Sequence, residues 1–115
     1  MLRLTFTASI VGILLLCINL VSCHPADGGR DTFPRTHTVE MKDFAFVPAT
    51  LEVSRGDSVR WINRDFVPHT ATGISNQWDS EQLSEGQFWV MAVDSSITYY
   101  CIYHPSMQGN IYVVD

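Results

Sequence analysis

The stretch Tyr99-Tyr100-Cys101-Ile102-Tyr103-His104-Pro105-Ser106-Met107 decides how this chain folds. Residues three apart in a strand point to opposite faces, so a continuous strand could not aim Cys101 and His104 at one point. A helix could, but Pro105 disfavours helical geometry at the residue before it, and the preceding residues are typical of a strand. We therefore expect a strand over residues 97–101, followed by a tight loop that closes around a bound group.

Outside the N-terminus, the rest of the sequence consists of short strand-like runs separated by turns. Apolar residues alternate in four further runs, at residues 36–41, 51–53, 59–63 and 111–114. Residues 87–93 are apolar on both faces, which predicts a central strand. Residues 70–85 are polar and turn-rich, which predicts a long connection anchored by Trp78, and Gly109 is expected to turn the chain into its last strand. Because no segment has a helical period, we expect an all-β fold, a single antiparallel or mixed β-sandwich of seven or eight strands.

Four side chains around the opening stretch form a ligand set for a soft metal. A thiolate (Cys101), an imidazole (His104) and a thioether (Met107) lie close together in sequence, and a second imidazole, His69, ends the segment Asn63-Arg64-Asp65-Phe66-Val67-Pro68-His69. Two histidines, one cysteine and a weak axial methionine are the blue-copper arrangement. Zinc could use the cysteine and both histidines, but a catalytic zinc usually has a nearby carboxylate, and Asp65 is the only candidate close in sequence.

On these motifs, the chain from about residue 36 to residue 114 resembles the small cupredoxins of the plastocyanin, pseudoazurin and amicyanin group. The segment from Asn63 to His69 resembles the Asn-to-His segment of the family. The Cys101-x-x-His104-x-x-Met107 spacing is typical of amicyanin, whereas plastocyanin and pseudoazurin have a longer His-to-Met interval. The sequence departs from its relatives at Ile102 and Tyr103, where they often carry small residues or proline. The resemblance implies a Greek-key β-sandwich, a cupredoxin domain, over residues 36–115.

The resemblance also implies roles for individual residues. It implies that one copper ion, cycling between Cu(I) and Cu(II), is held by His69, Cys101, His104 and Met107. It implies that the Asn63 side chain ties the His69 loop to the Cys101 loop. It places His104 at the surface in an apolar patch where protein redox partners dock transiently, with local candidates Phe66, Val67, Pro68, Tyr103, Pro105 and Met107.

The site favours a single-electron carrier over an enzyme. A metal inside a rigid sandwich needs little ligand movement when it changes oxidation state, and the ligand set leaves no open coordination position or acid–base pair. Two other functions stay open: a copper-binding delivery or storage protein on the same fold, and a Cys/His enzyme or zinc hydrolase.

Composition limits the partners. The chain has 115 residues, enough for one small domain, and its 12 acidic and 7 basic residues give a net charge of −5. Phosphate binding needs clustered lysine and arginine, so we expect no nucleic-acid partner. We expect a monomer.

The N-terminus is typical of an exported protein. Residues 1–22 combine Arg3 with an apolar run, which predicts a signal peptide. The run ends Leu20-Val21-Ser22-Cys23, which resembles the lipobox of bacterial lipoproteins and implies a lipid-modified Cys23. Residues 23–35, with two prolines and two adjacent glycines, are expected to be a flexible tether. We therefore expect the domain to be held at the periplasmic or extracellular face of a prokaryotic membrane.

Overall fold

The computed structural model describes residues 33–115. The predicted signal peptide, Cys23 and most of the predicted tether lie outside the described residues. The described part is all-β, as predicted, and no helix in it is long and apolar enough to cross a membrane. It contains eight strands: β1 (Thr36–Lys42), β2 (Ala45–Val47), β3 (Thr50–Ser54), β4 (Ser58–Asn63), β5 (Thr72–Gly73), β6 (Phe88–Ala92), β7 (Ile97–Tyr100) and β8 (Gln108–Val114).

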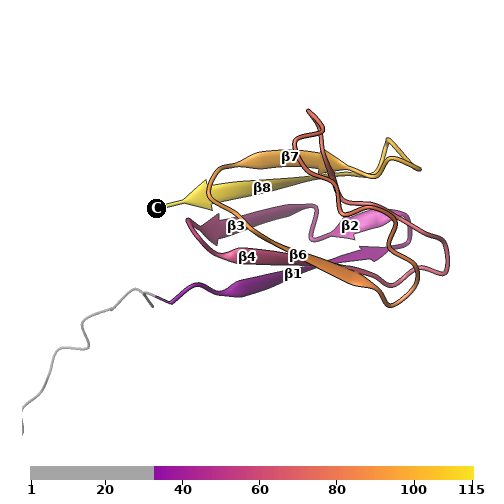
Figure 1. Cartoon of the computed structure of the whole chain (residues 1–115), viewed down its shortest axis with the longest axis horizontal. Helices are drawn as coiled ribbons and strands as arrows, with labels where there is room; N and C mark the ends of the chain where they lie inside the picture. Colours follow the sequence, from indigo (N-terminus) through magenta and orange to yellow (C-terminus); the bar gives the residue numbers. More distant parts are fainter. Residues whose placement is uncertain (1–32) are drawn as a thin grey trace, which may run out of the picture.

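The strands form two packed sheets of mixed direction, with strand orders β2-β1-β4-β6 and β3-β8-β7-β5. The β1–β4 and β3–β8 pairs are parallel, and the other neighbouring pairs are antiparallel. Figure 1 shows β1 and β7 running toward the same end of the sandwich, and β4 runs parallel to β1. The loops that follow these three strands therefore gather at one end of the molecule.

The core lies between the sheets and is rich in aromatic side chains. Trp61 of β4 is fully buried beside Tyr99 of β7, with ring centroids 5.4 Å apart. Trp78 and Trp89 stack at 5.7 Å, and both contact Trp61. Asn63 continues the inward-facing row of β4 and is itself fully buried, as its place in the alternation predicts.

The sequence prediction of a central strand at residues 87–93 is wrong. The strand there, β6, lies at the edge of its sheet, where β4 is its one partner among the described strands. Trp89 faces the core, while Phe88 and Val90 are 57% and 44% exposed. The guanidinium of Arg60 on β4 lies over the Phe88 ring, 5.5 Å from its centroid. The outward face of β6 is apolar although β6 is an edge strand. The Arg60 side chain covers part of this face, so its apolar residues do not require a second neighbouring strand.

The predicted connection over residues 70–85 is confirmed as non-helical, but it is not a loose loop. It contains β5 and folds back on the chain through bridges between His69 and Leu83 and between Thr72 and Asp79. Trp78 anchors it against the core, as predicted.

Gly109 has a different role from the predicted one. It lies within β8 directly opposite Tyr99, and a Cβ at this position would overlap Cζ and Oη of that buried ring. The close approach of the two strands, and not a turn, therefore requires a glycine here.

The end of the sandwich opposite the gathered loops is fastened by Asp57. Its carboxylate accepts hydrogen bonds from the N–H of Arg35 at 2.9 Å, the N–H of Ser54 at 3.1 Å and Nε2 of His37 at 2.7 Å. The Arg35 N–H and the His37 ring hold the pKa of Asp57 at about 2, against an ordinary value of 3.8, although burial acts in the opposite direction. This carboxylate fixes the start of β1 to the turn between β3 and β4.

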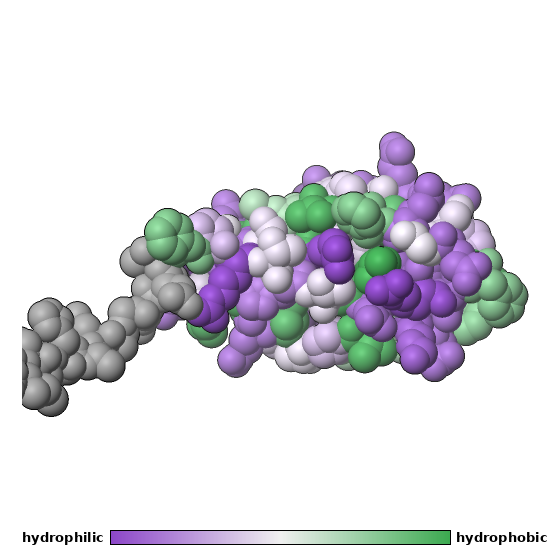
Figure 2. All heavy atoms as spheres, turned by 90° about the horizontal axis from the view of Figure 1, so that it is seen from below, coloured by the Kyte–Doolittle hydropathy of each residue, from purple (hydrophilic) through white to green (hydrophobic). Residues whose placement is uncertain are grey.

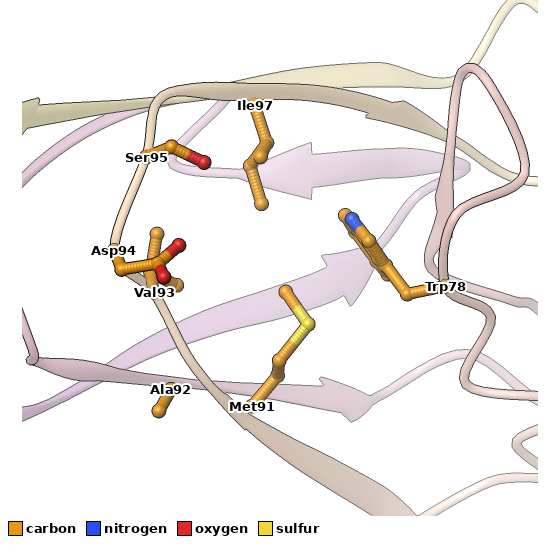
Figure 3. Close-up of a pocket in the computed structure, with 7 residues that line it drawn as sticks. All are labelled: Trp78, Met91, Ala92, Val93, Asp94, Ser95 and Ile97. Atoms are coloured by element: carbon orange, nitrogen blue, oxygen red, sulfur yellow. The ribbon is translucent and has the colours of Figure 1, made fainter.

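A small cavity lies between β6 and β7 (Figure 3). Its volume is about 110 Å³, well below the roughly 300–1,000 Å³ of typical small-molecule sites. It is lined by Trp78, Met91, Ala92, Val93, Asp94, Ser95 and Ile97, and none of the predicted metal ligands is among them.

Candidate metal centre

The predicted ligands meet at the end of the sandwich where the loops gather. His69 follows β4, and Cys101 and His104 follow β7. One donor atom from each, Nδ1 or Nε2 of the histidines and Sγ of the cysteine, lies within 4.8 Å of the others. His69 and Cys101 are fully buried, whereas His104 is half-buried. His69 lies more than thirty positions before Cys101 in sequence, and the packing of the two sheets brings it beside Cys101 and His104.

The strand β7 ends at Tyr100, one residue before the predicted end at Cys101, and the predicted tight loop follows it. The His104 N–H donates to the Cys101 carbonyl at 3.3 Å, and the Met107 N–H donates to the His104 carbonyl at 2.8 Å. The Cys101 N–H closes the loop by donating to the Met107 carbonyl at 3.0 Å. These successive turns are what put the Cys101 and His104 side chains on one side of the backbone.

Nδ1 is the nitrogen that both histidines turn toward the cysteine. It lies 3.7 Å from Cys101 Sγ in His69 and 3.9 Å from the same sulfur in His104. These separations are long for hydrogen bonds to sulfur. Two donors at about 2.0–2.3 Å from one metal, with an angle of about 120° between the bonds, would be about 3.8 Å apart. The spacing and the soft sulfur donor therefore fit a copper ion held by these three side chains.

The tautomer of His69 is fixed by a carboxylate. Its Nε2 lies 2.8 Å from Oδ2 of Asp65. A carboxylate only accepts hydrogen bonds, so Nε2 carries the proton and Nδ1 presents its lone pair toward Cys101. Such a partner orients a metal-binding imidazole and makes it a better ligand.

Asp65 is itself held in place from the other side. Its carboxylate accepts hydrogen bonds from the N–H groups of Asp43 at 2.8 Å and Phe44 at 3.1 Å. Burial raises the pKa of Asp65, but the Phe44 N–H, the His69 ring and the Asp43 N–H together outweigh burial and hold the pKa below its ordinary value of 3.8. The hairpin between β1 and β2 therefore supports the His69 ligand through this carboxylate.

Met107 is 3% exposed and lies in the same loop as Cys101 and His104. Its place in the ligand loop is the one predicted for an axial thioether. Its burial corrects the prediction that it contributes to the surface patch around His104.

The tie between the two ligand loops is made by Thr70 and not by Asn63. The Asn63 amide donates to the carbonyls of Val67 at 2.8 Å and Leu83 at 2.9 Å, so it braces the His69 loop instead of making the predicted tie to the Cys101 loop. The Thr70 N–H donates to Cys101 Sγ at 3.4 Å, and the Thr70 hydroxyl accepts from the Ile102 N–H at 2.9 Å. A polar residue directly after a ligand histidine was the available sequence signal for this role.

Phe44 is a second residue that sequence reasoning missed. Its ring meets the His104 ring edge to face at 4.9 Å and the His69 ring at 5.5 Å. The side chain is 49% exposed, so it lies between the two imidazoles and solvent. Its backbone has a positive φ of 58°, an uncommon conformation for a large side chain.

The loops around His104 carry exposed apolar side chains, and these differ in part from the predicted ones. Phe66 is 81% exposed and Tyr103 is 47% exposed. Two residues outside the predicted patch are also exposed: Phe44, which is distant in sequence, is 49% exposed, and Ile102 is 43% exposed. Figure 2 shows hydrophobic side chains among polar ones at this end of the molecule.

Comparisons with known proteins agree with this architecture. No protein-family model matches the chain. A copper-containing nitrite reductase (NirK) from Thermus scotoductus SA-01 has 26% sequence identity and a TM-score of 0.64 over 72% of this chain. This chain spans only 23% of the length of that reductase.

Two smaller proteins are covered more completely. A purple cupredoxin from Nitrosopumilus maritimus has 24% identity and a TM-score of 0.62, with 67% of this chain and 98% of that protein covered. A mutant of amicyanin in its reduced Cu(I) form at pH 4 has 23% identity and a TM-score of 0.62, with 69% and 82% covered. The arrangement of residues 33–115 is therefore the cupredoxin β-sandwich, and the chain has the cupredoxin fold.

Proposed function

We propose that this protein is a type 1 (blue) copper protein that carries single electrons between redox partners outside the cytoplasm. The observation that carries the proposal is the placement of the buried Cys101 Sγ between the Nδ1 atoms of His69 and His104, 3.7 and 3.9 Å away. When bound, copper would supply a one-electron couple, and His69, Cys101, His104 and the thioether of Met107 would hold it.

The hydrogen bonds made by Asp65 favour electron transfer over hydrolysis at this site. Asp65 is the carboxylate that a catalytic zinc would need, yet its oxygens accept hydrogen bonds from His69 Nε2 and two backbone N–H groups. It contacts the nitrogen of His69 that faces away from Cys101, so it is badly placed to move a proton at a metal-bound water. We therefore propose no enzymatic turnover at this site.

His104 is proposed as the route by which electrons enter and leave. It is the only one of the three clustered side chains that is not fully buried, and the exposed residues Phe44, Phe66 and Tyr103 lie in the loops at the same end. A small apolar surface of this kind suits a brief encounter with a protein redox partner. Such a contact would bring the partner's redox centre close to the metal without exposing Cys101.

Visible absorption and metal analysis of the purified protein after loading with Cu(II) test the proposal. An intense blue colour, one copper ion per chain and reversible one-electron cycling are expected. Cys101→Ser, which is close in size but lacks the thiolate, should bind Cu(II) without the colour. A wild-type protein that stays colourless after Cu(II) loading would overturn the proposal, and bound zinc with hydrolytic activity would replace it.

The same experiment separates a carrier from a copper delivery or storage protein. A delivery protein would release copper readily to a chelator and would be weakly coloured or colourless. The buried sulfur and the Asp65-fixed tautomer of His69 favour firm retention.

We propose that residues 1–22 direct export, that Cys23 is lipidated and that the domain acts as a monomer at the outer face of a prokaryotic membrane. Intact-mass analysis of membrane-derived protein tests the lipid, because a mature chain without added lipid mass would contradict it. Sedimentation of the purified protein tests the monomer.

A further inference from the structure

A row of hydrogen bonds runs from the loop after Cys101 to the surface of the connection over residues 70–85. The Ile102 N–H donates to the Thr70 hydroxyl at 2.9 Å. The hydroxyls of Thr70 and Thr72 are 2.9 Å apart, and the Thr72 hydroxyl donates to Oδ1 of Asp79 at 3.0 Å. A backbone N–H in the loop after Cys101 is thus joined to an exposed carboxylate through two side chains.

The chemistry of the last group sets the direction of the whole row. The Asp79 carboxylate only accepts, so the single hydroxyl proton of Thr72 points to it. Thr72 has no second hydroxyl proton, so the Thr70 hydroxyl donates to Thr72 and keeps its lone pair for the Ile102 N–H. Every proton in the row therefore points away from the Cys101 loop, and every hydroxyl oxygen points toward it.

Burial gives this alignment its strength. Thr70 and Thr72 are 2% and 1% exposed, so water does not compete for their hydroxyls. Hydrogen bonds in series polarise one another in such surroundings, by about 10–30% per bond. Asp79 is held in place by a further hydrogen bond from the Glu81 N–H to Oδ1 at 2.8 Å.

We propose that Asp79 is a positioning residue for the metal centre, acting through Thr72 and Thr70. Its charge aligns the two hydroxyls, strengthens the Ile102 hydrogen bond that holds the Cys101 loop, and places the negative ends of aligned dipoles toward the metal. The negative ends of these dipoles stabilise Cu(II) over Cu(I) and so lower the reduction potential of the copper. This effect on the potential rests on the proposed function. The effect on the Ile102 hydrogen bond does not depend on copper.

The copper-free protein gives the first test. Asp79→Asn keeps an acceptor oxygen for Thr72 but removes the charge, so the Ile102 amide proton resonance should move upfield as its hydrogen bond weakens. Glu81→Gln is the matched control, since it removes one exposed charge from the same segment and its side chain makes none of the described hydrogen bonds. It should leave the Ile102 resonance in place.

The copper-loaded protein gives the second test. The reduction potential should rise in Asp79→Asn by more than in Glu81→Gln, and the difference should persist in 1 M salt. At that ionic strength the screening length is about 3 Å, so the effect of a simple surface charge disappears.

Thr72→Val separates the row from the charge, because it removes the connecting hydroxyl and leaves Asp79 intact. It should shift the Ile102 resonance and the potential in the same directions as Asp79→Asn. The double variant should shift them by less than the sum of the two single changes, as coupled residues do.

An Ile102 resonance unchanged in Asp79→Asn, or equal shifts in Asp79→Asn and Glu81→Gln, would overturn the proposal even if Thr72→Val did not fold. A protein that fails to bind copper would refute the proposed function, whereas the copper-free measurement would still decide whether Asp79 acts on Ile102.

Discussion

Nε2 of His69 and Oδ2 of Asp65 lie 2.8 Å apart, four residues from each other in sequence, and this contact determines which nitrogen of His69 faces Cys101. We predict that Asp65→Asn lowers copper affinity by roughly 10- to 100-fold, as loss of such a supporting carboxylate does elsewhere. An asparagine that turned its NH₂ to the ring would favour the wrong tautomer. Competition titration with a copper chelator measures the change.

The control for Asp65→Asn is Asp43→Asn, which removes a neighbouring exposed carboxylate whose side chain makes none of the described hydrogen bonds. Its affinity should match that of the wild type. Equal losses in both variants would show that negative charge near the site, and not the hydrogen bond to His69, is responsible.

The edge-to-face contact of Phe44 with His104, at a centroid distance of 4.9 Å, leads to a second prediction. Aromatic pairs contribute about 0.5–1.5 kcal/mol beyond the area they bury, so Phe44→Ala should speed copper release to a chelator roughly two- to tenfold. Phe66→Ala is the matched control, because Phe66 is 81% exposed and has no described ring contact with either histidine. If both substitutions speed release equally, general loosening of the loops is the better explanation.

Asp57 leads to a prediction about acid stability. Its pKa is about 2 in the folded protein and 3.8 is its ordinary value, so its contribution to the free energy of unfolding is complete above about pH 4 and is lost as the pH falls toward 2. Asp57→Asn should therefore melt at a lower temperature than the wild type at pH 5, and the gap should narrow as the pH approaches 2. Thermal unfolding of the copper-free protein across this range measures it, and a gap that stays constant would show that Asp57 does not act through its charge.

Gly109 leads to a prediction about packing. An alanine at this position would overlap the fully buried Tyr99 ring, so Gly109→Ala should lower the free energy of unfolding by about 1–3 kcal/mol and the melting temperature by roughly 5–20 °C. Introducing the same change into Tyr99→Leu should cost less, because the smaller side chain leaves room for the methyl group. An equal cost in both backgrounds would place the cause in the backbone of β8 rather than in this contact.

Much of the candidate site could be predicted from the sequence because its information is local. The incompatibility of Cys101, His104 and Pro105 with a regular element predicts the loop, and the loop is present. Alternation in β1, β3 and β4 predicts their strands and the burial of Asn63. Side-chain period and proline geometry are properties of neighbouring residues, and they need no knowledge of the rest of the fold.

What the sequence alone determined was the set of donor atoms and the strand-and-loop pattern that carries them. The packing of distant segments determines which polar and aromatic residues support those donors. Thr70 and Cys101, Asp65 and Phe44, and Thr72 and Asp79 meet because two sheets pack and one connection folds back. Several polar side chains of the chain could make each of these contacts, and β6 could lie at the centre or at the edge of its sheet. Which contact forms, and where β6 lies, depends on the positions of distant backbone segments and not on the residue types themselves.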